Sequence, residues 1–266
     1  MFERTNHILV RVGWRKLSRT ILNLEDEPHE ALARATRFPA KPPGPESLPM
    51  LPSNRIPVAL KLAYTAFMVI LVPTYWREYG PTNFLYFCDV ALFFALGAVW
   101  LESPLLASMP AVGILLPQML WCVDFLGSCI GMRVMGMTEY MFDPSKSLFL
   151  RRLSFFHFWL PFLLVYIVWR LGYDRRALLG WTALAWLLQL VGYFLLPAGP
   201  APTDNRNLPV NVNYVFGFDD KTPQTWMPGG WFLVLMMTAL PLLLFLPTHF
   251  LLAWLAGPPR PKLRPA

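Results

Sequence analysis

The sequence predicts an all-α, polytopic integral membrane protein, and three observations support that prediction. Hydrophobic residues make up 55% of the 266 residues, charged residues only 15%, and the mean hydropathy is +0.42. Apolar runs of about 20 residues recur along the chain, which is the length that a helix needs to cross about 30 Å of hydrocarbon. These runs do not alternate as the strands of a barrel do, so a helical bundle is expected. A soluble enzyme, a disordered chain and a secreted disulfide scaffold are excluded.

Residues 1–25 predict a basic amphipathic helix that lies in the membrane interface. Its apolar side chains recur at helical spacing, at Val10, Trp14, Leu17, Ile21 and Leu24. An adjacent ridge is basic, at Arg11, Arg15 and Arg19. We expect Arg11, Trp14, Arg15 and Arg19 to contact lipid headgroups. The alternative is a helix that packs on the cytosolic face of the protein itself, or docks another membrane protein.

The rest of the chain divides into three parts. Residues 26–55 are polar and proline-rich and predict a linker. Residues 56–256 form the transmembrane domain, and residues 257–266 form a basic, proline-rich tail. Within the domain we expect about six spans, at Ile56–Tyr75, Asn83–Leu101, Pro104–Val123, Leu153–Trp169, Ala177–Pro197 and Gly230–Ala256. Several spans contain proline, so kinked helices are expected.

The distribution of positive charge predicts the orientation. Lysines and arginines gather in the N-terminal arm, in the 170–176 hairpin and in the tail. The positive-inside rule places these in the cytosol, with both termini cytosolic and, in a bacterium, the protein in the cytoplasmic membrane. Arg151 and Arg152 fall on the unfavoured side, so a reversed or five-span topology stays open. The formal charge of +7 fits anionic lipid headgroups as partners, and no nucleic acid is expected.

Polar groups inside the spans are the candidate functional residues, since they are costly in lipid. Cys88 and His157 each lie near the outer end of a span, about 6–8 Å deep at 1.5 Å per residue. Asp89 is next to the thiol, and Asn211, Asn213 and Tyr214 come from an outer loop at the same side. A neighbouring imidazole can activate a cysteine by taking its proton, while amides stabilise an oxyanion. This arrangement predicts a Cys88–His157 nucleophilic pair supported by those polar groups.

The simpler alternative is structural. A membrane cysteine often packs as a small side chain, a lone histidine often forms an interhelical hydrogen bond, and Asp89 would pair with Arg151 or Arg152. The histidines show no ligand spacing, so no metal site is predicted. The chain has no Gly-x-Gly-x-x-Gly, Walker or Gly-x-Ser-x-Gly motif, and no cofactor is predicted.

The order of short motifs resembles the YwaF-like and transmembrane-protein-164-like family of six-span membrane proteins. The matching segments are 84–91 around Cys88-Asp89, 155–157 before Gly172-Tyr173, 211–214, and 228–232. The resemblance covers about residues 56–256 and implies a lipid acyltransferase with Cys88 as the nucleophile and His157 as the base. The approach to the cysteine departs from the family, because residues 84–87 are hydrophobic here.

Two functions follow as hypotheses. The first is a lipid acyltransferase or acyl hydrolase that uses Cys88 and His157 near the non-cytoplasmic face. The second is a non-enzymatic scaffold or lipid-binding subunit, favoured by the basic helix and the linker.

Overall fold

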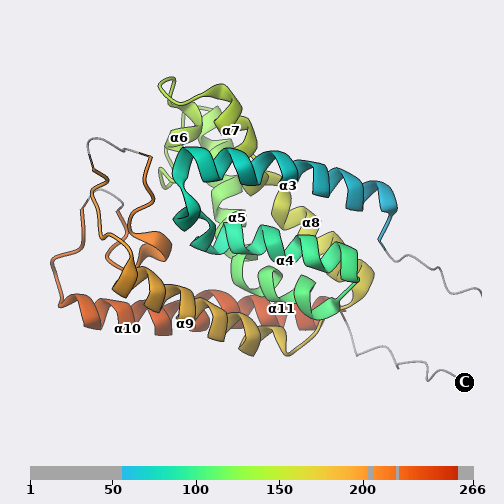
Figure 1. The fold of residues 1–266 in the computed structure, drawn as a ribbon. Coiled ribbons are helices and arrows are strands. Elements are labelled where there is room, and N and C mark those ends of the chain that lie inside the picture. Colours follow the sequence, from blue (N-terminus) through green and yellow to red (C-terminus); the bar gives the residue numbers. More distant parts are fainter. Residues whose placement is uncertain (1–55, 203–206, 220–221, 257–266) are drawn as a thin grey trace, which may run out of the picture. The chain divides into compact units, whose positions relative to one another are not determined.

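The structure is a computed structural model that describes residues 56–202, 207–219 and 222–256 (Figure 1). Within these ranges every regular element is a helix. The predicted amphipathic helix with Arg11, Trp14, Arg15 and Arg19 lies outside the described residues, as do the linker and the tail. The all-α prediction is confirmed for the part of the chain that is described.

Five helical segments in the described ranges are long and apolar enough to span a membrane. They are α3 (Val58–Tyr79), α5 (Pro104–Cys129), α7 with α8 (Leu148–Ser154 and Phe156–Leu171), α9 (Ala177–Leu195), and α10 with α11 (Gly229–Leu240 and Leu246–Ala256). The composition and length of these helices are those of a multi-pass membrane protein.

The predicted second span is shorter than expected. It divides into the 3-10 helix η2 (Pro81–Leu85) and the apolar helix α4 (Phe87–Leu101). At 1.5 Å per residue α4 is about 22 Å long, which is less than the hydrocarbon thickness of about 30 Å. The division is at Tyr86, whose extended backbone (φ −63°, ψ 141°) separates η2 from α4. The six predicted spans are therefore five long helices and one short one.

Helix α5 is central in the bundle. Within the apolar 18-residue stretch of each span, 61% of α5 is buried inside the protein, against 22–44% for the other four spans. Helix α5 packs against α4, α8, α9 and α11. Small buried side chains, Ala107, Ala111 and Gly113, let these neighbours approach closely. At Gly113 the Trp181 indole of α9 lies where a Cβ atom would be.

The last span changes its winding at Pro241. Proline has no N–H, so the carbonyl of Met237 loses its helical partner. The Nε1 of Trp186 on α9 donates to this carbonyl at 2.7 Å, and the helix widens into the π-helical segment η4 (Pro241–Phe245) before α11. The freed carbonyl is thus satisfied inside the protein, as a hydrocarbon environment requires.

The connection between the predicted spans Pro104–Val123 and Leu153–Trp169 is partly helical. Helix α5 continues to Cys129, a short helix α6 (Glu139–Phe142) follows, and α7 begins at Leu148. One buried carboxylate holds the turns between α5 and α7 by its hydrogen bonds.

That carboxylate is Asp124, which is 0% exposed. Its Oδ1 accepts from the backbone N–H groups of Met135 (2.6 Å) and Gly136 (2.9 Å). Its Oδ2 accepts from the backbone N–H and the hydroxyl of Thr138, both at 2.8 Å. Four donors hold the charge, so burial of Asp124 is compensated.

Candidate functional site

Cys88 and Asp89 lie in the first turn of α4. The Cys88 Sγ donates to Asp89 Oδ2 at 3.7 Å. Asp89 is 3% exposed, and its Oδ1 has no hydrogen-bond partner. An acidic side chain in the first turn of a helix is favoured by the unpaired N–H groups there. The sequence therefore folds into a thiol that faces a buried carboxylate with one unused oxygen.

Asn213 positions this turn. Its Oδ1 accepts from the Phe87 backbone N–H at 2.9 Å, and its Nδ2 donates to the Leu85 carbonyl at 2.9 Å. The Tyr86 hydroxyl also donates to the carbonyl of Val210 at 3.1 Å. The loop after α9 therefore caps the N-terminus of α4 at Phe87, the residue before Cys88.

The other two predicted loop residues do not approach the thiol in this way. Asn211 is 0% exposed, and its amide hydrogen-bonds within the loop, to Gly217, Asp219 and Phe216. Tyr214 is 41% exposed. Asn211, Asn213 and Tyr214 all have left-handed φ values, of 48°, 60° and 59°, which costs non-glycine residues energy. The Asn211 amide stabilises the loop, and Asn213 joins the loop to the start of α4 by its two hydrogen bonds.

His157 lies in the first turn of α8. Its Nδ1 is 2.8 Å from the carbonyl oxygen of Ser154. A carbonyl only accepts, so Nδ1 carries the proton and Nε2 is the basic nitrogen of the neutral ring. The ring stacks on Trp121, with centroids 5.4 Å apart, and on Phe156. The Ser154 hydroxyl is 2.7 Å from that of Tyr75, which joins α3 to the end of α7.

Tyr140 of α6 lies within electrostatic range of Cys88 and Asp89. Burial raises the pKa of its phenol well above the usual range, and the nearby Cys88 and Asp89 raise it further. The Trp121 indole lies beside the same phenol, and Asp89 is also within electrostatic range of Tyr75. We call this group the polar cluster; its members are Tyr75, Cys88, Asp89, Tyr140, Ser154 and His157.

Cys88 and His157 are linked to this cluster through different partners. Helices α4 and α8 are in contact, as the predicted pair requires. The hydrogen bond of the thiol goes to Asp89, however, and that of the His157 Nδ1 goes to Ser154. No hydrogen bond joins Cys88 to His157 in the described part of the chain.

The predicted ion pair between Asp89 and Arg151 or Arg152 is wrong. Arg151 donates to the Met141 carbonyl at 3.1 Å, and none of the three ion pairs of the described residues includes Asp89. Sequence reasoning missed Tyr75, Ser154 and Tyr140. Their hydroxyls in or beside apolar runs were the available signal, because buried hydroxyls in such places need partners.

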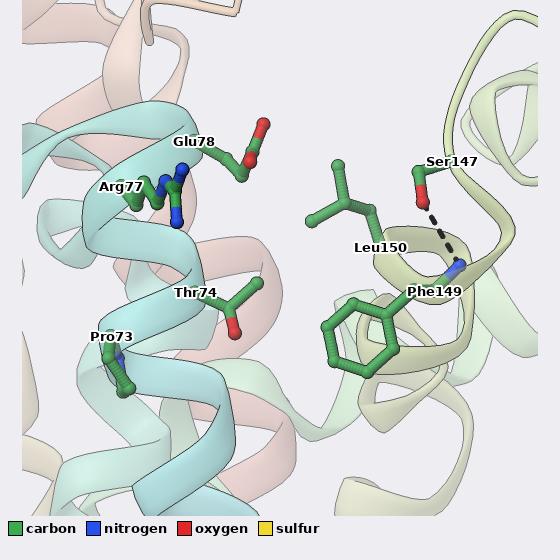
Figure 2. Close-up of a pocket in the computed structure, with 7 residues that line it drawn as sticks. All are labelled: Pro73, Thr74, Arg77, Glu78, Ser147, Phe149 and Leu150. Atoms are coloured by element: carbon green, nitrogen blue, oxygen red, sulfur yellow. Dashed lines mark hydrogen bonds between the residues drawn. The ribbon is translucent and has the colours of Figure 1, made fainter.

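A groove of about 430 Å³ lies between α3 and α7 at the same end of the bundle. Figure 2 shows its two walls, one from α3 with Pro73, Thr74, Arg77 and Glu78, and one from α7 with Ser147, Phe149 and Leu150. Arg77 and Glu78 form no ion pair with the described residues. Tyr75, in the same turn of α3, faces inward to Ser154. The groove and the polar cluster are therefore on opposite sides of one helical turn.

Among the described residues, no three His, Cys, Asp or Glu side chains gather as metal ligands. Comparisons with known protein families, with curated proteins and with solved structures found no match to this chain. The family resemblance stays a prediction, and the chemistry of the site has to be argued from its own geometry.

Proposed function

We propose that this multi-pass protein is an enzyme that acts on acyl esters of membrane lipids, with Cys88 as the nucleophile. The observation that supports this most is the Cys88 thiol donating to a buried carboxylate whose second oxygen is unpartnered. A cysteine attacks as the thiolate, and a hydrogen-bonded base is what it needs to form one. The immediate base is then Asp89, in place of the His157 that the sequence predicted.

The proposed reaction has two steps. The thiol attacks the acyl carbon as its proton passes to Asp89, and the ester C–O bond breaks as the leaving alcohol takes that proton. In the second step an alcohol or water attacks the acyl-cysteine, the C–S bond breaks, and the thiol is restored. His157, whose Nε2 is the basic nitrogen of its neutral ring, is the candidate base where the incoming acceptor is an alcohol.

The groove between α3 and α7 supports a lipid as the substrate. It lies at an end of membrane-spanning helices, where headgroups are found. Arg77 would meet a phosphate, and exposed Phe149 would meet acyl chains. Membrane lipids are therefore the partners that we propose.

The test uses the purified full chain in phospholipid nanodiscs with a lipid carrying a labelled acyl chain. We expect Cys88→Ala to abolish release of the label, and intact-mass spectra of the wild type to show a hydroxylamine-sensitive acyl adduct. Cys129→Ala removes an exposed cysteine and is the matched control. Undiminished turnover in Cys88→Ala would overturn the proposal.

A non-enzymatic scaffold or lipid-binding subunit is the second candidate. The stacking of His157 on Trp121 and Phe156 favours it, because a packed ring is typical of a structural histidine. This candidate predicts that His157→Gln lowers thermal stability and that the wild type forms no acyl adduct. A stable His157→Gln variant that has lost turnover would exclude the scaffold.

A further inference from the structure

The connection between α5 and α7 turns back along the helix that it leaves. The backbone N–H of Met132 donates to the carbonyl of Gly127 at 2.9 Å. The N–H of Met135 then donates to the carboxylate of Asp124 at 2.6 Å. Because α5 ends at Cys129, the chain has by this point returned about 8 Å along the helix.

Two side-chain contacts hold this reversal. The Val134 side chain lies against Gly127, where an added Cβ atom would come within 2.6 Å of it. The hydroxyls of Ser128 and Thr138 are 3.2 Å apart. The chain reverses at Gly131, whose φ of 79° is a conformation that residues with a Cβ atom rarely adopt. The returning chain is therefore packed on the last turns of α5.

Residues 130–138, which we call the return segment, expose mainly apolar side chains. Five of these side chains are large, hydrophobic and between 36% and 74% exposed; they are Ile130, Met132, Val134, Met135 and Met137. A contiguous apolar surface of this kind marks a contact with a membrane or with another protein.

The exposed face of α5 continues into this surface. Leu120, Val123 and Leu126 are exposed and recur every three residues, so they share one side of the helix. Because α5 has the length and composition of a membrane span, lipid is what meets that side. The return segment runs back beside the same turns, and its surroundings are continuous with the lipid around the bundle.

The lengths of the adjoining spans set the depth of the connection. Helix α5 has 26 residues and α7 with α8 has 24, so they are about 39 Å and about 36 Å long. The hydrocarbon core of a bilayer is about 30 Å thick, and the bilayer with its headgroup regions is about 40–45 Å thick. Both spans therefore end among the headgroups. A return of about 8 Å along α5 brings Met135 to the edge of the hydrocarbon.

Asp124 supplies hydrogen bonds that the return segment needs at this depth. Lipid offers no partner to backbone N–H groups, so the protein has to provide one. The Asp124 carboxylate accepts from three of them, those of Met135, Gly136 and Thr138. The two charged side chains here, Arg133 and Glu139, pair with each other at 2.7 Å, and both are long enough to reach the headgroups.

We propose that the return segment is a re-entrant, lipid-binding surface, with the Met132 and Met135 side chains inserted between the acyl chains of bilayer phospholipids. Methionine suits this partner, because its flexible thioether side chain adapts to irregular apolar surroundings. The assignment does not rest on the proposed catalysis, and it gives the buried Asp124 a role in holding backbone at the membrane surface.

Nitroxide accessibility tests the depth of the segment. The full chain, with its three cysteines replaced by alanine, carries a nitroxide at Met135→Cys in phospholipid nanodiscs. Oxygen concentrates in lipid and a nickel chelate stays in water, so power saturation compares the two surroundings. We expect the ratio of oxygen to nickel accessibility at residue 135 to be at least three times that at Ser145→Cys, an exposed position of the same connection.

The wild-type chain allows a second measurement that needs no substitution. In nanodiscs whose phospholipid carries a diazirine near the carboxyl end of its acyl chain, irradiation should attach lipid to residues 130–138. Residues 143–147 are the internal control and should stay unmodified. Neither measurement depends on turnover, so a failure of the proposed function leaves both results intact.

Equal accessibility ratios at residues 135 and 145, or the absence of lipid adducts on residues 130–138, would overturn the proposal and place the segment in water. Dipolar broadening between the nitroxides of two copies would also overturn it, because a second copy would then cover the methionines. A nitroxide shielded from both oxygen and the nickel chelate would show burial against protein, with the same consequence.

Discussion

Two buried aspartates, one near the end of α5 and one at the start of α4, have opposite surroundings. Asp124 accepts four hydrogen bonds at 2.6–2.9 Å. Asp89 has one contact, with the Cys88 thiol at 3.7 Å, and an oxygen without a partner. Both are 3% exposed or less. Burial of a carboxylate costs several kcal/mol unless donors compensate it, so folding explains Asp124 and leaves Asp89 unexplained.

This difference distinguishes Asp124, which holds the connection between α5 and α7, from Asp89 in the candidate site. A compensated carboxylate fixes a loop, and its removal leaves backbone donors unpaired. An uncompensated one is expected where a reaction uses it, because its place at the start of a helix offsets only part of the cost of burial. The comparison predicts that the two aspartates respond oppositely to the same substitutions.

The largest loss of stability is expected for Asp124→Ala. The substitution leaves the N–H groups of Met135, Gly136 and Thr138 without their acceptor, which should cost about 3–5 kcal/mol. Thermal unfolding in nanodiscs and limited proteolysis within residues 130–147 measure the effect. Asp143→Ala removes an acceptor of one backbone N–H, that of Ser145, and is the matched control. Equal melting temperatures for the two variants would contradict the structural role of Asp124.

The next largest effect is expected at the contact between α5 and α9. In Gly113→Ala the added methyl would overlap the Trp181 indole, which is fully buried and cannot move aside. We expect a loss of about 1–3 kcal/mol from overpacking. Gly230→Ala is the control, since a Cβ there meets nothing within 4 Å. If the two variants have the same melting temperature, α5 and α9 are not packed as described.

A smaller effect is expected for the cap of α4. Asn213→Ala removes both hydrogen bonds to the backbone of Phe87 and Leu85, at about 1–2 kcal/mol, and adds the strain of a left-handed alanine. Asn213→Gly removes the same bonds without that strain and should be the milder of the two. The rate of Cys88 alkylation by a maleimide reports the position of the first turn of α4. An unchanged rate in both variants would show that the loop does not position the thiol.

The sequence was sufficient for the apolar helices. Apolar length predicted the spans from α3 to α11, and the spacing of Cys88 and His157 from their span ends predicted a shared end. Partners were harder to predict, because they depend on which faces of α4, α5 and α8 meet. Asp124 is an example: its four donors come from a turn 11–14 residues away, which no helical period reveals.

The partner of Cys88 could not be predicted from the sequence for a related reason. Depth alone predicted that His157 lies near the thiol, whereas its Nδ1 hydrogen-bonds the carbonyl of Ser154, three residues earlier in the chain. The hydroxyls of Tyr75 and Tyr140 then occupy the surroundings of Asp89. Hydroxyls within apolar segments were thus the better guide to the site than the spacing of nucleophile and base.

The smallest effect on stability, and the sharpest test of the comparison, is expected for Asp89→Asn. The amide keeps the shape of the side chain and removes a charge that no ion pair compensates, so unfolding should change by less than about 1 kcal/mol. Turnover should fall, because the thiol loses its proton acceptor, while the alkylation rate of Cys88 should not fall, because removal of a neighbouring negative charge favours the thiolate. Asp124→Asn, which keeps two acceptor positions at most, should instead destabilise the loop and leave the thiol reactive. An Asp89→Asn variant that unfolds as early as Asp124→Asn would make both carboxylates structural, and Cys88 would then have no base among its observed contacts.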